Sequence, residues 1–137
     1  MLKIATFNIE NLDTSSSQSS PSLSERAPIL RDVFKRLDAD IVCLQEVHGQ
    51  ELPNHTARDP RRNLSALAFI LEGSDYAQYY QVHTVTSDSV PYDKRNLVIL
   101  SRWPISANHQ YKHNFIDKLR YRKVTALPPE DDKDVGW

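Results

Sequence analysis

Two apolar stretches, each followed at once by polar residues, decide the fold of this chain: Lys3–Leu12 (KIATFNIENL) and Ala39–Val47 (ADIVCLQEV). In the first, Leu2–Phe7 is typical of a strand because its apolar residues suit a sheet, and Asn8–Asp13 is expected to leave that strand. In the second, Ile41–Leu44 is an uninterrupted apolar run, which predicts a strand that is covered on both faces.

The segment between these two strands predicts a helix. Leu30, Val33, Phe34 and Leu37 recur at helical spacing and therefore fall on one face, with Ser24 as the expected N-terminal cap. A strand, a helix and a strand in this order form a βαβ unit, whose two strands lie parallel and whose crossover is right-handed. We therefore expect an α/β fold.

The rest of the chain alternates between apolar segments and polar loops. It predicts a second helix over Leu64–Leu71 and strands over Tyr76–Thr86, Leu97–Leu100 and Ser106–Phe115. The acidic, proline-bearing stretch Pro128–Gly136 is typical of a loop.

Composition limits the classes of function. A formal net charge of −1 removes the strong, sequence-independent attraction to nucleic acid that a basic domain has. The single cysteine, Cys43, lies in an apolar run, and we predict a reduced and buried thiol. The first ten residues contain Glu10 and no long apolar stretch, so we expect neither a signal peptide nor a membrane span, and a cytoplasmic protein.

Polar side chains follow both strands of the predicted βαβ unit. Asn8 and Glu10 come after the first strand, and Glu46 comes after the second. Because the carboxyl ends of parallel strands meet at one edge of a sheet, we expect these side chains to converge. Two carboxylates beside a neutral amide suit Mg²⁺, which takes oxygen ligands and completes its shell with water and substrate phosphate.

The same segments resemble motifs of the endonuclease/exonuclease/phosphatase superfamily, the metal-dependent phosphodiesterases related to apurinic/apyrimidinic endonucleases and DNase I. KIATFNIENL resembles its opening motif, an apolar strand followed by N-x-[DEN]-[NG]-L, and ADIVCLQEV resembles its second, P-D-[IV]-[ILV]-x-L-Q-E. RNLVILSRWPI (95–105) resembles the later strand G-x-[AG]-[IL]-L-S-[RK]-x-P-[IL]. The three segments occur in the family's order, and the resemblance covers essentially the whole chain.

The resemblance implies roles for individual residues. Glu46 matches the family's metal-binding glutamate, and Asn8 matches the asparagine that contacts phosphate and supports the metal-bound carboxylate. Glu10 occupies the position where some relatives carry an acidic metal ligand. Arg95 and Asn96 replace the small residues that are usual before the third motif strand, so the resemblance assigns them no role.

The family's reaction is hydrolysis of a phosphoester, in which water attacks a metal-held phosphoryl group in line. It also requires an Asp-x-Asn motif and a late Asp-His pair, and the chain contains neither. The resemblance therefore implies the N-terminal half of a two-sheet α/β sandwich (DNase I-like), incomplete, with residues 1–137 forming a partial domain. We expect this fragment to be inactive and to bind Mg²⁺ or Mn²⁺ only weakly.

Other interpretations stay open at this point. A half sandwich would expose an apolar face, and a non-catalytic fragment could cover it with a complementary half or with a second copy of itself. The phosphoester substrate could be DNA or RNA, a phosphoinositide or a phospholipid head group. The arginines at 58, 61 and 62 could be a solvated surface or phosphate contacts, and we interpret His48 as a loop histidine. A nucleotide-binding module is disfavoured, because no glycine-rich phosphate loop is present.

Overall fold

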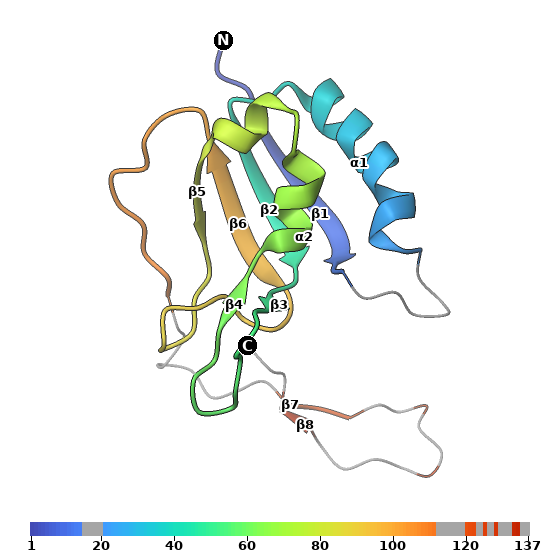
Figure 1. The fold of residues 1–137 in the computed structure, drawn as a ribbon, viewed down its shortest axis with the longest axis vertical. Coiled ribbons are helices and arrows are strands. Elements are labelled where there is room, and N and C mark those ends of the chain that lie inside the picture. The colour runs from blue at the N-terminus through green and yellow to red at the C-terminus, as the bar shows by residue number, and fades with distance from the viewer. Residues whose placement is uncertain (15–20, 112–119, 123–124, 126–127, 129–132, 135–137) are drawn as a thin grey trace.

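The computed structural model describes residues 1–14, 21–111, 120–122, 125, 128 and 133–134. Its main part is a four-stranded sheet with two helices (Figure 1). None of the helices in these ranges is long and apolar enough to span a membrane. In chain order, the elements are β1 (Ile4–Leu12), α1 (Leu23–Leu37), β2 (Ile41–Val47), β3 (Gln50–Glu51), β4 (Arg62–Asn63), α2 (Ser65–Leu71), the 3₁₀ turn η1 (Asp75–Gln78), β5 (Tyr80–His83), β6 (Asn96–Ser101), β7 (Arg120–Tyr121) and β8 (Lys133–Asp134).

The predicted βαβ unit is confirmed. Strands β1 and β2 pair in parallel, in a register that runs from Ile4 opposite Ile41 to Asn8 opposite Gln45. Strand β6 is antiparallel to β2, and β5 is antiparallel to β6, so the sheet is mixed and has the order β1-β2-β6-β5. The β1 prediction was too short, because the strand continues past Phe7 and pairs again at Leu12.

Helix α1 begins two residues earlier than expected, with Ser22 and not Ser24 as its cap. The Ser22 side chain accepts a hydrogen bond from the Glu25 backbone N–H, and the Glu25 carboxylate accepts one from the Ser22 N–H at 2.8 Å. This reciprocal capping box satisfies two helix-end donors, which explains the preference for Ser22. At the other end, Asp38 adopts a left-handed conformation that closes the helix.

The helices cover one face of the sheet, and α2 lies in front of that sheet in Figure 1. The rings of Phe34 on α1 and Tyr76 on η1 contact edge to face, with their centroids 5.3 Å apart. This close-packed layer is the hydrophobic core of the described residues. Its largest fully buried apolar side chains are Ile9, Leu12, Phe34, Val42, Leu44, Val47, Leu67, Ile70, Val98 and Leu100.

The opposite face of the sheet is open, which corrects the expectation that β2 is covered on both faces. Thr6, Cys43, Ile99 and Val82 lie side by side across the four strands on this face. Within the described ranges no helix packs over them, and Ile99 is 40% exposed. The thiol of Cys43 is therefore only half-buried, where the sequence predicted burial.

The segment predicted as one strand over Tyr76–Thr86 is divided. Its first residues form η1, because Tyr76 turns inward and its buried hydroxyl accepts a hydrogen bond from the Ala39 backbone N–H at 2.7 Å. Strand β5 then keeps only four residues. The expected strand over Ser106–Phe115 is absent from 106–111, and its remainder lies outside the described residues. Of the loop predicted over Pro128–Gly136, the described part includes β8, which pairs with β7.

Replacing Tyr76 by phenylalanine should destabilise the fold. The substitution leaves the buried Ala39 N–H without its partner, which typically costs about 1–3 kcal/mol. Urea denaturation followed by circular dichroism should show a lower midpoint for Y76F. The matched control is Y80F, since Tyr80 is 51% exposed and its hydroxyl makes no hydrogen bond with the described residues. An equally lowered denaturation midpoint in Y76F and Y80F would contradict the structural role of the Tyr76 hydroxyl.

Candidate functional site

The pairing of β1 with β2 is interrupted where the predicted site residues lie. Regular pairing ends at Asn8 opposite Gln45 and resumes at Leu12 opposite Val47. Three residues of β1 therefore stand opposite Glu46 alone, and the ladder between β2 and β6 shifts at the same place. Such bulges commonly redirect side chains near functional sites. Here the bulge lets Val47 enter the core, although Gln45 lies on the open face.

Backbone conformations around this bulge are unusual for residues with side chains. The φ angles are positive at Glu10 (52°), Asn11 (47°), Glu46 (63°) and Arg95 (59°). Asparagine tolerates this left-handed region, whereas glutamate and arginine visit it less readily. Each such residue costs on the order of 1–3 kcal/mol unless its surroundings hold it in place, and such strain is typical of functional sites.

The carboxylate of Glu46 lies beside two amide groups. The side-chain amide of Asn8 stabilises the ionised carboxylate, and this interaction is the main reason that the pKa of Glu46 is lower than usual. The backbone N–H of Asn11 donates a hydrogen bond to Glu46 Oε2 at 3.2 Å, and electrostatic interactions with Arg95 and His48 lower the pKa of Glu46 further. Partial desolvation opposes these effects without reversing them. Glu46 is therefore ionised at neutral pH.

Asn8 interacts with both glutamates of the predicted site. Its Oδ1 accepts a hydrogen bond from the Glu10 backbone N–H at 2.9 Å, and its side-chain amide lowers the pKa of Glu46. The structure thus brings Asn8 and Glu46 together at the edge where the sequence predicted them. The exposed Glu10 carboxylate makes no hydrogen bond or ion pair with the described residues. Within those residues, no three His, Cys, Asp or Glu side chains form a group that could hold a metal ion, and a carboxylate pair completed by water remains a prediction.

Sequence analysis missed the residues that surround this pair. His48, interpreted as a loop histidine, has its Nε2 3.2 Å from Asn11 Oδ1 and its Nδ1 3.6 Å from Asp13 Oδ2. Gln50 is buried and donates to Asp13 Oδ1 at 3.1 Å. The only sequence signal for these residues was their place just after Asn8 and Glu46, and such polar positions are common after strands.

Asn96, to which the resemblance assigned no role, is fully buried and fully hydrogen-bonded. Its amide nitrogen donates to the carbonyls of Val47 (2.9 Å) and Tyr92 (2.8 Å). Its Oδ1 accepts from the Tyr92 N–H and from the Thr84 hydroxyl. Asn96 therefore has a structural role. Its hydrogen bonds hold β6 and the preceding loop against the end of β2, immediately after Glu46.

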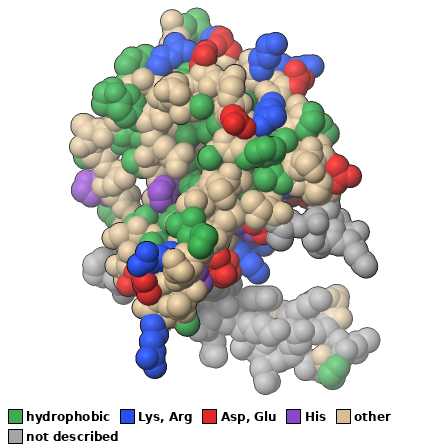
Figure 2. Space-filling model, viewed as in Figure 1, with side chains coloured by type: hydrophobic (Ala, Val, Ile, Leu, Met, Phe, Trp, Pro, Cys, Tyr) green, Lys and Arg blue, Asp and Glu red, His purple; other side chains and the backbone are tan. Residues whose placement is uncertain are grey.

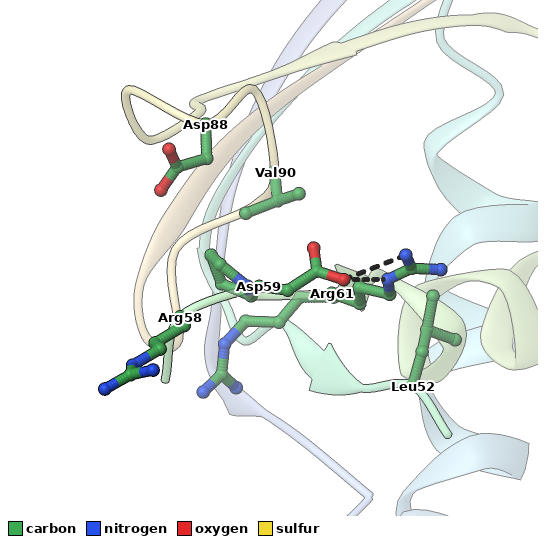
Figure 3. Close-up of a pocket in the computed structure, with 8 residues that line it drawn as sticks. Leu52, Arg58, Asp59, Arg61, Asp88 and Val90 are labelled. Carbon is green, nitrogen blue, oxygen red and sulfur yellow. Dashed lines mark hydrogen bonds and ion pairs between the residues drawn. The ribbon is translucent and has the colours of Figure 1, made fainter. Parts of the chain in front are cut away.

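The arginine-rich loop forms a separate shallow hollow, shown in Figure 3. Arg61 is paired with Asp59 at 2.8 Å, and Arg62 is paired with Glu51 and Asp93. Arg58 extends away from the Asp59–Arg61 pair. Because acidic partners neutralise two of the three arginines, this hollow is a weaker phosphate site than the sequence allowed. Its lining residues are Leu52, Arg58, Asp59, Pro60, Arg61, Arg62, Asp88 and Val90.

Replacing Asn8 by alanine should raise the pKa of Glu46 toward its ordinary value, because the amide that stabilises the ionised carboxylate most is lost. The Glu46 carboxyl ¹³C signal should then titrate at higher pH in N8A than in the wild type. D32N is the control, since Asp32 pairs with Arg36 on α1. An unchanged Glu46 titration in N8A would show that Asn8 does not stabilise the carboxylate.

Comparison with known proteins agrees with the sequence motifs and the fold. A family model described as the endonuclease/exonuclease/phosphatase family matches residues 5–137. No curated protein and no solved structure gives a significant match. The matched region contains the whole mixed sheet from Ala5 onward, both helices and the Asn8–Glu46 pair. The chain belongs to the endonuclease/exonuclease/phosphatase family, and its α/β sheet is an incomplete form of the DNase I-like domain.

Proposed function

We propose that the protein is a phosphoester hydrolase that depends on a divalent cation, Mg²⁺ or Mn²⁺. In this proposal Glu46 and Glu10 hold the cation, and Asn8 contacts the phosphate while it orients Glu46. The observation that carries the proposal is the ionised Glu46 carboxylate at the bulge between β1 and β2, which accepts the Asn11 backbone N–H and is stabilised by the Asn8 amide.

The donor set is chemically suited to a hard cation. Glu46 is half-buried, and its two oxygens provide about four lone-pair directions, of which the Asn11 hydrogen bond uses one. Carboxylates that bind metals are commonly oriented by such N–H donors. Mg²⁺ commonly takes one or two carboxylates and fills its remaining positions with water and phosphate oxygens, which fits Glu46 and the exposed Glu10.

Each residue has a defined part in this proposal. When bound, the cation would act as a Lewis acid that stabilises charge on the phosphoryl oxygens. Glu46 keeps its negative charge to low pH because the amides of Asn8 and Asn11 stabilise the ionised carboxylate. Asn8 is neutral, so it can lie beside a phosphate oxygen without repelling it. Glu10 is exposed and has a positive φ within the bulge, and it would supply the second carboxylate.

The distribution of charged side chains gives only a partial indication of the substrate class. On the face shown in Figure 2, basic and acidic side chains are interleaved and form no continuous basic stripe. Together with the net charge of −1, this favours local recognition of a phosphate group over long-range attraction to a polyanion. A nucleic acid is the first substrate to test, followed by phosphoinositides and phospholipid head groups.

We further propose that residues 1–137 alone do not turn substrate over, because the chain has no Asp-x-Asn motif to complete the site. The wild-type chain should bind Mn²⁺ weakly, as measured by electron paramagnetic resonance. E46A should weaken binding at least about 10-fold, since the main carboxylate ligand is lost. Binding should also fall as the pH drops through the lowered pKa of Glu46, where the carboxylate becomes protonated.

E72A is the matched control, because Glu72 is an exposed acid next to α2 that only pairs loosely with Arg31 at 3.8 Å. Equal Mn²⁺ affinity in E46A and the wild type would refute the cation site. In parallel, bis-p-nitrophenyl phosphate should not be hydrolysed above the rate with Mn²⁺ alone. Turnover that E46A abolishes would refute the proposed inactivity and leave the hydrolase assignment standing.

The open face of the sheet favours a second candidate function, association with a complementary half or with a second copy. Ile4, Leu97 and Ile99 are 64%, 54% and 40% exposed on β1 and β6. Adjacent apolar side chains on a sheet face are typical of interaction surfaces. In this proposal, the partner buries the face opposite α1 and α2, and the Asn8–Glu46 pair lies at the margin of the contact.

Size-exclusion chromatography with light scattering should show concentration-dependent dimers of the wild-type chain, or monomers that bind an apolar dye strongly. I99K should reduce both the dimer fraction and the dye signal, because a charge in the centre of the open face opposes its burial. Q81K, an exposed position on β5 next to the covered face, is the control. A clean monomer with low dye binding would contradict this candidate.

A further inference from the structure

We propose that His48 is a positioning residue of this site, which holds Asn11 in the conformation that directs its backbone N–H to Glu46. Nothing in the motifs assigns His48 a role, and it does not have to touch substrate or cation. Its effect on cation affinity rests on the proposed function, whereas its effect on Asn11 does not.

The imidazole of His48 has a polar neighbour at each ring nitrogen. Its Nε2 lies 3.2 Å from Asn11 Oδ1, and its Nδ1 lies 3.6 Å from Asp13 Oδ2. The His48 backbone N–H donates to the Leu12 carbonyl at 2.9 Å, and its side chain is only 12% exposed. The ring therefore lies between Asn11, which donates its backbone N–H to Glu46, and Asp13.

Asn11 requires such support. It follows Glu10 as the second of two consecutive residues with positive φ, in a part of β1 that has no regular pairing with β2. If its side chain were released, the backbone could relax toward the extended region that residues with side chains prefer. The Asn11 N–H would then turn away from Glu46 Oε2, which it now reaches at 3.2 Å.

The support for His48 extends into the second helix. Gln50 donates to Asp13 Oδ1 at 3.1 Å and to the His48 carbonyl at 2.9 Å. Its own side-chain oxygen accepts the Ala66 backbone N–H at 3.0 Å, at the start of α2. Gln50 is buried, so this contact is shielded from water. A continuous chain of polar contacts thus runs from α2 through His48 to the Glu46 carboxylate.

A merely structural histidine would stabilise the loop without affecting Glu46. Two variants separate these cases: H48A removes both ring contacts, while H48Q keeps a side-chain N–H donor that can reach Asn11 Oδ1. H109A is the control, because His109 is exposed and, within the described residues, its ring contacts only Tyr111. The first readout is the Asn11 amide proton chemical shift without metal, and the second is the dissociation constant for Mn²⁺.

In H48A the Asn11 amide proton should move upfield, since its bond to the carboxylate is lost, while the amides of Thr6 and Cys43 in the regular sheet keep their shifts. Mn²⁺ affinity should fall about 10- to 100-fold, as is typical when a contact that orients a metal ligand is removed. H48Q should restore most of the Asn11 amide shift and of the Mn²⁺ affinity, and H109A should resemble the wild type in both.

An unchanged Asn11 shift in H48A would overturn the proposal, as would equal changes throughout the sheet or equal effects of H48A and H48Q. The two proposals fail separately. If the wild-type chain binds no Mn²⁺, the proposed function fails, and the Asn11 shift in the metal-free variants still decides whether His48 positions this residue.

Discussion

The structure depends on one mismatch between neighbouring strands: three residues of β1 stand opposite Glu46 alone. In an unbroken parallel ladder the backbone N–H groups of β1 would bond to carbonyls of β2. The bulge frees the N–H of Asn11 for a carboxylate and brings Asn8 to the same side chain. A lowered pKa for Glu46, and with it a fixed negative charge, is the direct consequence.

Three different elements hold this strained segment. From α1, the guanidinium of Arg26 donates to the Ile9 carbonyl at the start of the bulge. From β6, Asn96 bonds the Val47 carbonyl just after Glu46, and from α2, contacts arrive through Gln50. Because these contacts come from different elements of the fold, the positive φ angles can persist although no glycine is present there. The packing of the helices is thus coupled to the geometry of one carboxylate.

The same sheet has two unlike faces. One face is closed by α1 and α2, and its side chains form the core, while the face with Cys43 and Ile99 has no cover from the described residues. This asymmetry separates the two proposed functions, because the Glu46 site needs only the end of the sheet, whereas association needs its open surface. A partner on the open face would change the surroundings of Asn8, which lies on that face in register with Gln45.

Local sequence patterns determined the βαβ unit, the parallel pairing of β1 with β2, and the arrival of Asn8 and Glu46 at one edge, since strand order and periodicity suffice for these. They also predicted α2 and β6. Only the tertiary structure decided the bulge, the Ser22 cap, the open face and the contacts of His48. Each depends on contacts or on competition between alternatives that the periodicity of one segment does not contain. His48 shows this most clearly, because it lies in a loop as predicted, and only the fold placed Asn11, distant along the chain, against its ring.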